Sequence, residues 1–256
     1  MAKKIFGLKQ IRQLEEIQKT RLKKEGTGIH EEVQELIQRL TAGGVGTPDT
    51  ADPFLIQTKV LWDFGWGREL GVTTIDAYRK SVEKEGLATK PDRPAGMPEH
   101  LNRLVLWDRR PLLEKRERRE QVSLVKICRL LNVDFSGDDE TFIQHEATPE
   151  ITVPVRWVWC QDGRRNRNRS PKDCRTSFHA PEVGIEALGG LFLFAQDRSV
   201  IGGTRGAWHV VDLPGSVHRD CPSRCACLLL WSGWPRLRWG WDDDADPGCG
   251  SASRWE

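Results

Sequence analysis

Apolar positions in the first part of the chain recur at the spacing of helices. In residues 8–24 they lie three apart, and in residues 29–40 they follow the i, i+4, i+7, i+8 pattern of an amphipathic helix that ends before a glycine pair. These two stretches predict a helical hairpin. After a short apolar element at Phe54–Trp62, a further helix is predicted from Thr73, which is placed to cap it, to about Gly86.

The pattern is less regular in the middle of the chain. Residues 88–98 contain three prolines and predict a linker. Leu101–Trp107 predicts a short helix or a turn. A proline suited to the first turn begins one long predicted helix over residues 111–132, polar in its first half and apolar in its second. The acidic stretch 137–150 predicts a domain boundary.

Beyond residue 150 the chain is rich in β-branched, aromatic and turn residues, which favour strands. One helix is expected here, packed on a small sheet. The predicted elements are a strand at Ile151–Trp159, a helix at Pro181–Ala195, a strand at Ala207–Leu213 closed by a turn at Pro214–Gly215, and a hairpin of Cys227–Trp231 and Leu237–Trp241.

Together these elements predict an α+β protein, with a helical N-terminal half followed by a small β-rich C-terminal module that carries one packed helix. The predicted regions are a helical one at residues 1–87, a linker and long helix at residues 88–136, and a module containing many Trp, Cys and Arg residues at residues 150–256. The sequence contains no internal repeat.

The composition is that of a folded protein outside the membrane. With 38% hydrophobic residues among 256, the chain can bury a core. Its longest apolar run, Ala187–Ala195, is shorter than the roughly 20 residues of a bilayer-spanning helix. The charged N-terminal sequence lacks the apolar core of a signal peptide, which predicts a cytoplasmic location. Seven cysteines in such a chain are expected to be mostly reduced thiols.

The small net charge of +2 is unevenly placed, because residues 151–256 carry all of it. Its densest part is the basic loop, residues 164–172. Arginines separated by single residues offer forked donors that neutralise phosphates without reading a base sequence, and tryptophans can stack on unpaired bases. The predicted nucleic-acid-binding residues are Arg164, Arg165, Arg167, Arg169 and Lys172 for phosphate, and Trp157 and Trp159 for stacking. The alternative is a solvated turn whose arginines pair with acidic residues near the C-terminus.

Two sets of residues could hold a metal ion. Six cysteines after residue 150 could supply four thiolates for a structural Zn²⁺, but none forms the Cys-x-x-Cys pair typical of such sites, so buried thiols or disulfides are the alternatives. The acidic loop, Asp242–Asp246, could with Asp212 bind Mg²⁺ or Ca²⁺ for phosphoester chemistry, or it could simply pair with the basic loop. The predicted metal residues are Cys160, Cys174, Asp242 and Asp244.

Tryptophans cluster near the end of the sequence. Trp239 and Trp241 are two residues apart and therefore share one face of a strand. They form either a flat platform for a sugar or a base, or a part of the core. The sequence contains no GxGxxG, P-loop, HExxH or GxSxG motif, so it supplies no catalytic signature.

The strings WVWCQDGRRNRNRSPKDCR, VDLPGS and DDDADPGCGSASR lie in the C-terminal part of the chain. In these strings the chain resembles a family of uncharacterised bacterial proteins that share them in their C-terminal halves. The resemblance implies a bacterial, soluble protein and brings no activity with it. The segment CPSRCACLLL, residues 221–230, is unusually rich in cysteine for its surroundings, which weakens any metal site built on its three thiols.

The sequence therefore predicts a non-enzymatic protein that binds a polyanion, foremost nucleic acid, through the basic loop. One alternative is a metal-dependent phosphoester hydrolase that uses Asp242–Asp246. The other is a structural module that meets a protein partner through the narrow apolar stripe of its N-terminal helices.

Overall fold

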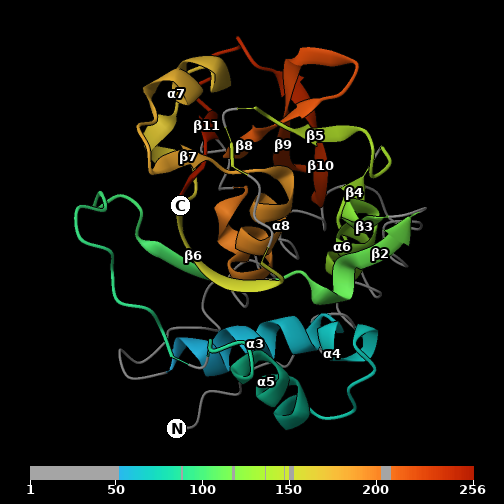
Figure 1. Cartoon of the computed structure of the whole chain (residues 1–256). Coiled ribbons are helices and arrows are strands. Elements are labelled where there is room, and N and C mark those ends of the chain that lie inside the picture. Colours follow the sequence, from blue (N-terminus) through green and yellow to red (C-terminus); the bar gives the residue numbers. More distant parts are fainter. Residues whose placement is uncertain are drawn as a thin grey trace, which may run out of the picture. The chain divides into compact units, whose positions relative to one another are not determined.

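The computed structural model of the chain describes residues 52–87, 89–116, 119–135, 137–146, 148–149, 153–202 and 209–256. The helical hairpin predicted from residues 8–24 and 29–40 lies outside them. The described part contains helices and mainly antiparallel sheets, which confirms the α+β class (Figure 1). None of its helices is long and apolar enough to span a bilayer.

Three short helices begin the described part: α3 (Pro53–Asp63), α4 (Trp66–Glu69) and α5 (Ile75–Glu83). Asp52 caps α3 by accepting the N–H of Phe54 at 2.9 Å, and Thr74 caps α5 by accepting the N–H of Ala77 at 3.2 Å. The helix predicted from Thr73 is therefore formed, with its cap one residue later. The short apolar element predicted before it is the helix α3.

A sheet of four strands has the order β1-β6-β12-β7, and every neighbouring pair in it is antiparallel. Its strands are β1 (Arg103–Asp108), β6 (Val155–Gln161), β12 (Ser253–Trp255) and β7 (Glu182–Gly184). The expectation of a helix or turn at Leu101–Trp107 is corrected, because these residues pair along their length with β6. The strand predicted at Ile151–Trp159 is formed, beginning at Val155.

A second sheet has the order β11-β8-β9-β10-β4, with β5 paired to β8. Its strands are β4 (Asp134–Phe135), β5 (Phe142–Gln144), β8 (Val210–His218), β9 (Cys221–Trp231), β10 (Trp234–Trp241) and β11 (Cys249–Ser251). The predicted hairpin is confirmed as β9 and β10, joined at Ser232-Gly233, both with positive φ. The turn predicted at Pro214–Gly215 is wrong, because β8 continues through it with an irregularity in its pairing.

The long helix predicted over residues 111–132 is also wrong. The chain instead forms η1 (Arg110–Leu112), β2 (Leu113–Arg116), β3 (Arg119–Val122) and α6 (Leu124–Leu131). The polar first half of the stretch has no apolar side to bury, and it pairs with itself as the β2–β3 ribbon. The helix is confined to the apolar second half, where Ser123 caps it by accepting the N–H of Lys126 at 3.1 Å.

The helix α8 (Ala187–Gln196) lies at the centre of the core, and its residues from Ala187 to Ala195 are all buried. It packs against β1 of the first sheet, against β8 and β9 of the second, and against α3 and α6, as Figure 1 shows. The ring of Phe192 stacks on Trp107 with centroids 5.8 Å apart. The predicted packed helix is thus formed from Ala187, while the residues before it include β7.

Candidate functional site

The basic loop is held against β11 of the second sheet and against the acidic loop by its backbone and by the side chain of Asn166. It begins with η2 (Arg164–Asn166) and runs into α7 (Pro171–Ser177). The buried side chain of Asn166 donates to the carbonyl of Ser251 at 2.7 Å, and the N–H of Asn168 donates to the carbonyl of Asp246 at 3.2 Å. Ser170 caps α7. The cations of the loop are therefore carried on a fixed backbone.

The five cations of this loop differ in their surroundings. Arg164, Arg165, Arg169 and Lys172 are exposed, whereas Arg167 is half-buried. Arg164 forms an ion pair with Asp162, and Arg165 contacts the imidazole of His100. Within the described part of the chain, Arg165, Arg169 and Lys172 have no carboxylate partner. Three exposed positive charges of the loop are thus left for an external anion.

Asp162 is the buried carboxylate beneath the loop. Its Oδ2 accepts from Arg103 at 2.8 Å, in addition to the ion pair with Arg164. Its carbonyl lies 2.7 Å from Nε2 of His209, whose Nδ1 accepts from Arg167 at 3.4 Å. Burial lowers the pKa of His209, although the hydrogen bond to the Asp162 carbonyl acts in the opposite direction. A neutral His209 with its proton on Nε2 satisfies both contacts.

The two predicted stacking residues lie on β6 and are largely covered. Trp157 is buried in the core, with its indole N–H donating to the carbonyl of Leu87 at 3.1 Å, so it offers no face to a base. Trp159 is half-buried, and the cations of Lys90 and Arg93 lie 5.7 and 5.5 Å from its ring centroid. Of the proposed platform pair, Trp239 packs on Phe142, whereas Trp241 is 53% exposed.

The acidic loop lies beside the basic loop, as expected if the two loops were to pair. The contacts between them, however, are mainly hydrogen bonds between backbone groups. The N–H of Lys172 donates to the carbonyl of Asp242 at 2.8 Å. The carboxylate of Asp242 is buried and forms an ion pair with Arg175 of α7. None of the arginines at 164–169 forms an ion pair with Asp242–Asp246 in the described structure.

The predicted metal residues do not come together. Cys160 lies on β6 and Cys174 on α7, both fully buried. In the part of the chain that the structure describes, no three His, Cys, Asp or Glu side chains are grouped so that they could ligate one ion. All seven cysteines are free thiols. Burial raises the pKa of Cys160 and of Cys227 to about 12, which keeps both protonated at neutral pH.

Asp212 is nevertheless brought to the acidic loop. The register of β8 places it opposite Cys227 of β9 and opposite Ser251 of β11, and it is 6% exposed. Its carboxyl accepts no hydrogen bond from any described residue. Burial raises the pKa of Asp212 to about 7, and the charges of Asp244 and Asp246 add to the shift. Within the described residues these carboxyls nevertheless form no group of three that could ligate a metal ion.

Replacing Asp212 with Asn is expected to stabilise the fold above neutral pH. The unfolded chain releases this proton near its ordinary pKa of 3.8, whereas the folded chain holds it to about 7, so wild-type stability falls as pH rises across that interval. The Asp212→Asn variant has no carboxyl to ionise at this position, so it does not undergo this decrease in the free energy of unfolding, which is at most about 4 kcal/mol. Urea unfolding at about pH 4 and about pH 8 measures it. The exposed Asp243→Asn is the control, and equal effects of the two variants at both pH values would contradict the assignment.

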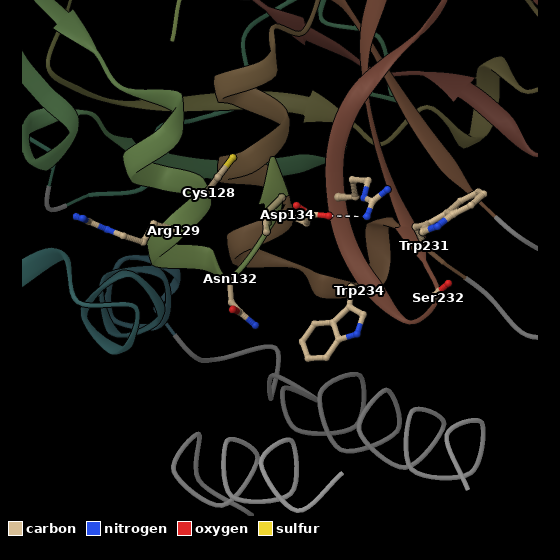
Figure 2. A pocket seen from close by; sticks show the side chains of 9 residues that line it. Cys128, Arg129, Asn132, Asp134, Trp231, Ser232 and Trp234 are labelled. Atoms are coloured by element: carbon tan, nitrogen blue, oxygen red, sulfur yellow. Dashed lines mark ion pairs between the residues drawn. The ribbon is translucent and has the colours of Figure 1, made fainter. Parts of the chain in front are cut away.

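A pocket that the sequence did not reveal lies between the end of α6 and the tip of the β9–β10 hairpin (Figure 2). Its volume is about 610 Å³, within the range of small-molecule sites. The residues lining it are Cys128, Arg129, Asn132, Val133, Asp134, Trp231, Ser232, Trp234 and Arg236. Two of these residues, Trp231 and Trp234, belong to the cluster of tryptophans near the end of the sequence.

No family model, curated protein or solved structure matches the chain. The roles of these residues therefore follow from geometry and chemistry alone.

Proposed function

We propose that the protein is a non-enzymatic polyanion-binding protein whose basic loop contacts nucleic acid. The observation that supports this best is the set of exposed cations, Arg165, Arg169 and Lys172, none of which meets a carboxylate in the described part of the chain. Guanidinium and ammonium groups of this kind bind phosphate and release its counterions.

The anchoring of the loop favours binding further. Asn166 and the backbone of Asn168 tie the loop to the strand ends, so few backbone conformations are lost when an anion binds. Arg164 forms an ion pair with the buried Asp162. It therefore helps to position the loop and offers less free charge to an anion than the other cations do. The loop thus presents a preformed row of donors suited to a phosphate backbone.

The acidic loop sets a limit on this interaction. Asp243, Asp244 and Asp246 are exposed, and the backbone of their loop touches the basic loop at Asn168 and Lys172. Their charges repel phosphate on that side. We therefore expect modest affinity, strong dependence on salt, and contacts to the backbone of nucleic acid rather than to its bases. A cytoplasmic location, which the N-terminal sequence predicts, is part of this proposal.

The metal-dependent hydrolase is less well supported. The carboxylate of Asp242 is committed to Arg175, and the described residues contain no group of three ligands. The proposed partner-binding role of the N-terminal helices concerns residues outside the described part and stays a prediction.

The proposal is tested by a triple variant, Arg165→Ala, Arg169→Ala and Lys172→Ala, against a labelled oligothymidylate of about 20 nucleotides. We expect affinity at low salt to fall by about tenfold or more, because three phosphate contacts are lost. The slope of log affinity against log salt should become shallower by about 2, since each contact to a single strand contributes about 0.7. Fluorescence anisotropy at several salt concentrations measures both quantities.

The matched control removes the same charge elsewhere. Arg68, Lys80 and Lys84 are exposed on or next to α4 and α5, and replacing all three with Ala lowers the net charge equally. Wild-type affinity in this control, together with loss in the loop variant, supports a local site. Equal loss in both variants, or in neither, would refute it.

A further inference from the structure

A network of hydrogen bonds on one face of the first sheet begins directly before the basic loop. The side chain of Gln161, at the end of β6, accepts the N–H of Gly163 and donates to Oγ of Ser253 at 2.9 Å. The hydroxyl of Ser253 in turn donates to Oε1 of Glu182 on β7. Gln161 lies opposite Ser253, and Glu182 is the diagonal neighbour of Ser253 on the same face. Because a backbone N–H can only donate, Gly163 sets the direction of every hydrogen bond in this series.

His100 joins this network at Glu182 and connects it to Arg165 of the basic loop. Nε2 of His100 lies 2.9 Å from Oε1 of Glu182, and Nδ1 of His100 contacts the guanidinium of Arg165. An ionised carboxylate only accepts and a guanidinium only donates, so the imidazole donates through Nε2 and accepts through Nδ1. The side chains of His100 and Glu182 are 18% and 11% exposed, whereas Arg165 is exposed. His100 therefore links a largely buried carboxylate to an exposed cation.

The neutral imidazole holds Arg165 differently from the way in which a carboxylate holds Arg164. Asp162 forms an ion pair with Arg164 directly, which offsets the positive charge of that arginine. The imidazole ring stands between Arg165 and Glu182, and in the described part of the chain these two residues form no ion pair with each other. A guanidinium has five N–H donors, so contact with one ring nitrogen leaves others for a phosphate. Arg165 is thus restrained while its charge stays available to an external anion.

We infer that His100, oriented by Glu182, is a positioning residue that holds Arg165 ready for a phosphate group of the bound polyanion. Restraining an arginine side chain in advance reduces the conformational entropy that is lost when phosphate binds, which corresponds to about two- to tenfold in affinity. This role rests on the polyanion-binding function proposed above for the basic loop. No sequence motif marks His100, because its partner Glu182 follows 82 residues later in the chain.

A double-mutant cycle with the full chain tests this role, using the labelled oligothymidylate at about pH 8, where histidine side chains are ordinarily neutral. His100→Leu should weaken binding by about fivefold, because Arg165 is no longer restrained. In an Arg165→Ala background the same substitution should have no effect, since no guanidinium is left to position. His100→Asn, whose Oδ1 can replace Nδ1 as the acceptor, should bind within about twofold of the wild type. Fluorescence anisotropy measures these affinities.

His179→Leu is the matched control, since it removes an exposed histidine three residues before Glu182 and should bind like the wild type. Nitrogen NMR of the imidazole tests the geometry without any ligand, because His100 should carry its proton on Nε2 alone at about pH 8. A proton on Nδ1, or equal losses from His100→Leu in the two backgrounds, would overturn the role of His100 while leaving the function of the loop intact. No binding by the wild type would instead overturn the proposed function, and this role with it.

Discussion

Replacing Gly163 with Ala is expected to destabilise the fold by about 4 kcal/mol, the combined effect of strained backbone and a clash that cannot relax. Gly163 has φ of +86°, and an added Cβ would lie 2.1 Å from the carbonyl oxygen of Gly250. The obstacle is backbone of β11, not a side chain that can rotate away. Because Gly163 directly precedes η2, the same substitution should also displace the basic loop and weaken binding of the oligothymidylate.

The Gly71→Ala variant separates the effect of backbone strain from the effect of the clash. Gly71 also has a positive φ, +69°, but no atom lies within 4 Å of an added Cβ. It should cost only the backbone strain, about 1 kcal/mol. Urea unfolding of both variants measures the difference. If Gly163→Ala were no more harmful than Gly71→Ala, the close approach of Gly163 to Gly250 would be wrong.

Replacing Arg254 with Met is expected to cost about 3 to 5 kcal/mol, the usual result of removing one partner of a buried ion pair. Arg254 lies on β12, in the interior of the first sheet, and its side chain is fully buried. Its Nε donates to Glu186 at 2.9 Å and Nη2 donates to the carbonyl of Pro149 at 2.8 Å. Methionine keeps most of the volume of the side chain. The decrease in the free energy of unfolding therefore measures the effect of leaving the Glu186 carboxylate and the Pro149 carbonyl without this partner.

Arg156→Met provides the comparison on the neighbouring strand β6. The side chain of Arg156 is 27% exposed, and within the described part of the chain its ion pair is a long one, with Glu256 at 4.0 Å. Burial lowers the pKa of Arg156, and the nearby positive charge of Arg254 lowers it further. Its removal should therefore change the free energy of unfolding by less than about 1 kcal/mol. Similar melting temperatures for the two variants would show that the Arg254 pairs do not support the sheet.

The sequence predicts best those helices and strands whose conformation is determined by their own residues. The β9–β10 hairpin combines two apolar strands with a Ser-Gly turn, and α8 is apolar all round. The conformation of residues 111–132 could not be predicted in this way. The charged first half consists of residues with high helix propensity but has no apolar side. Its conformation is decided by the pairing of β2 with β3. Likewise, β1 is a strand because β6 lies beside it.

The candidate site likewise has features that the sequence predicts and features that depend on segments far away in the chain. Exposure of Arg164, Arg165, Arg169 and Lys172 follows from their charge and spacing, and the sequence predicts it. The alternation of β6 puts Trp157 and Trp159 on one face, but which face is covered depends on segments such as Leu87 and Lys90 that lie far away in sequence. The pocket joins the end of α6 to a hairpin that follows much later in the chain, so no local pattern contains it.

The order of strands in the first sheet has a kinetic consequence. Neighbours β1, β6, β12 and β7 are separated by long stretches of chain, and none of these pairs is closed by a tight turn. Each pairing requires a large loop to close before contacts compensate for the lost entropy. The β9–β10 hairpin, closed by two residues, can form within about 10 μs, whereas the first sheet should assemble on the scale of about milliseconds to seconds. Refolding should therefore pass through a species in which the hairpin is formed and the indole of Trp107 is still in water.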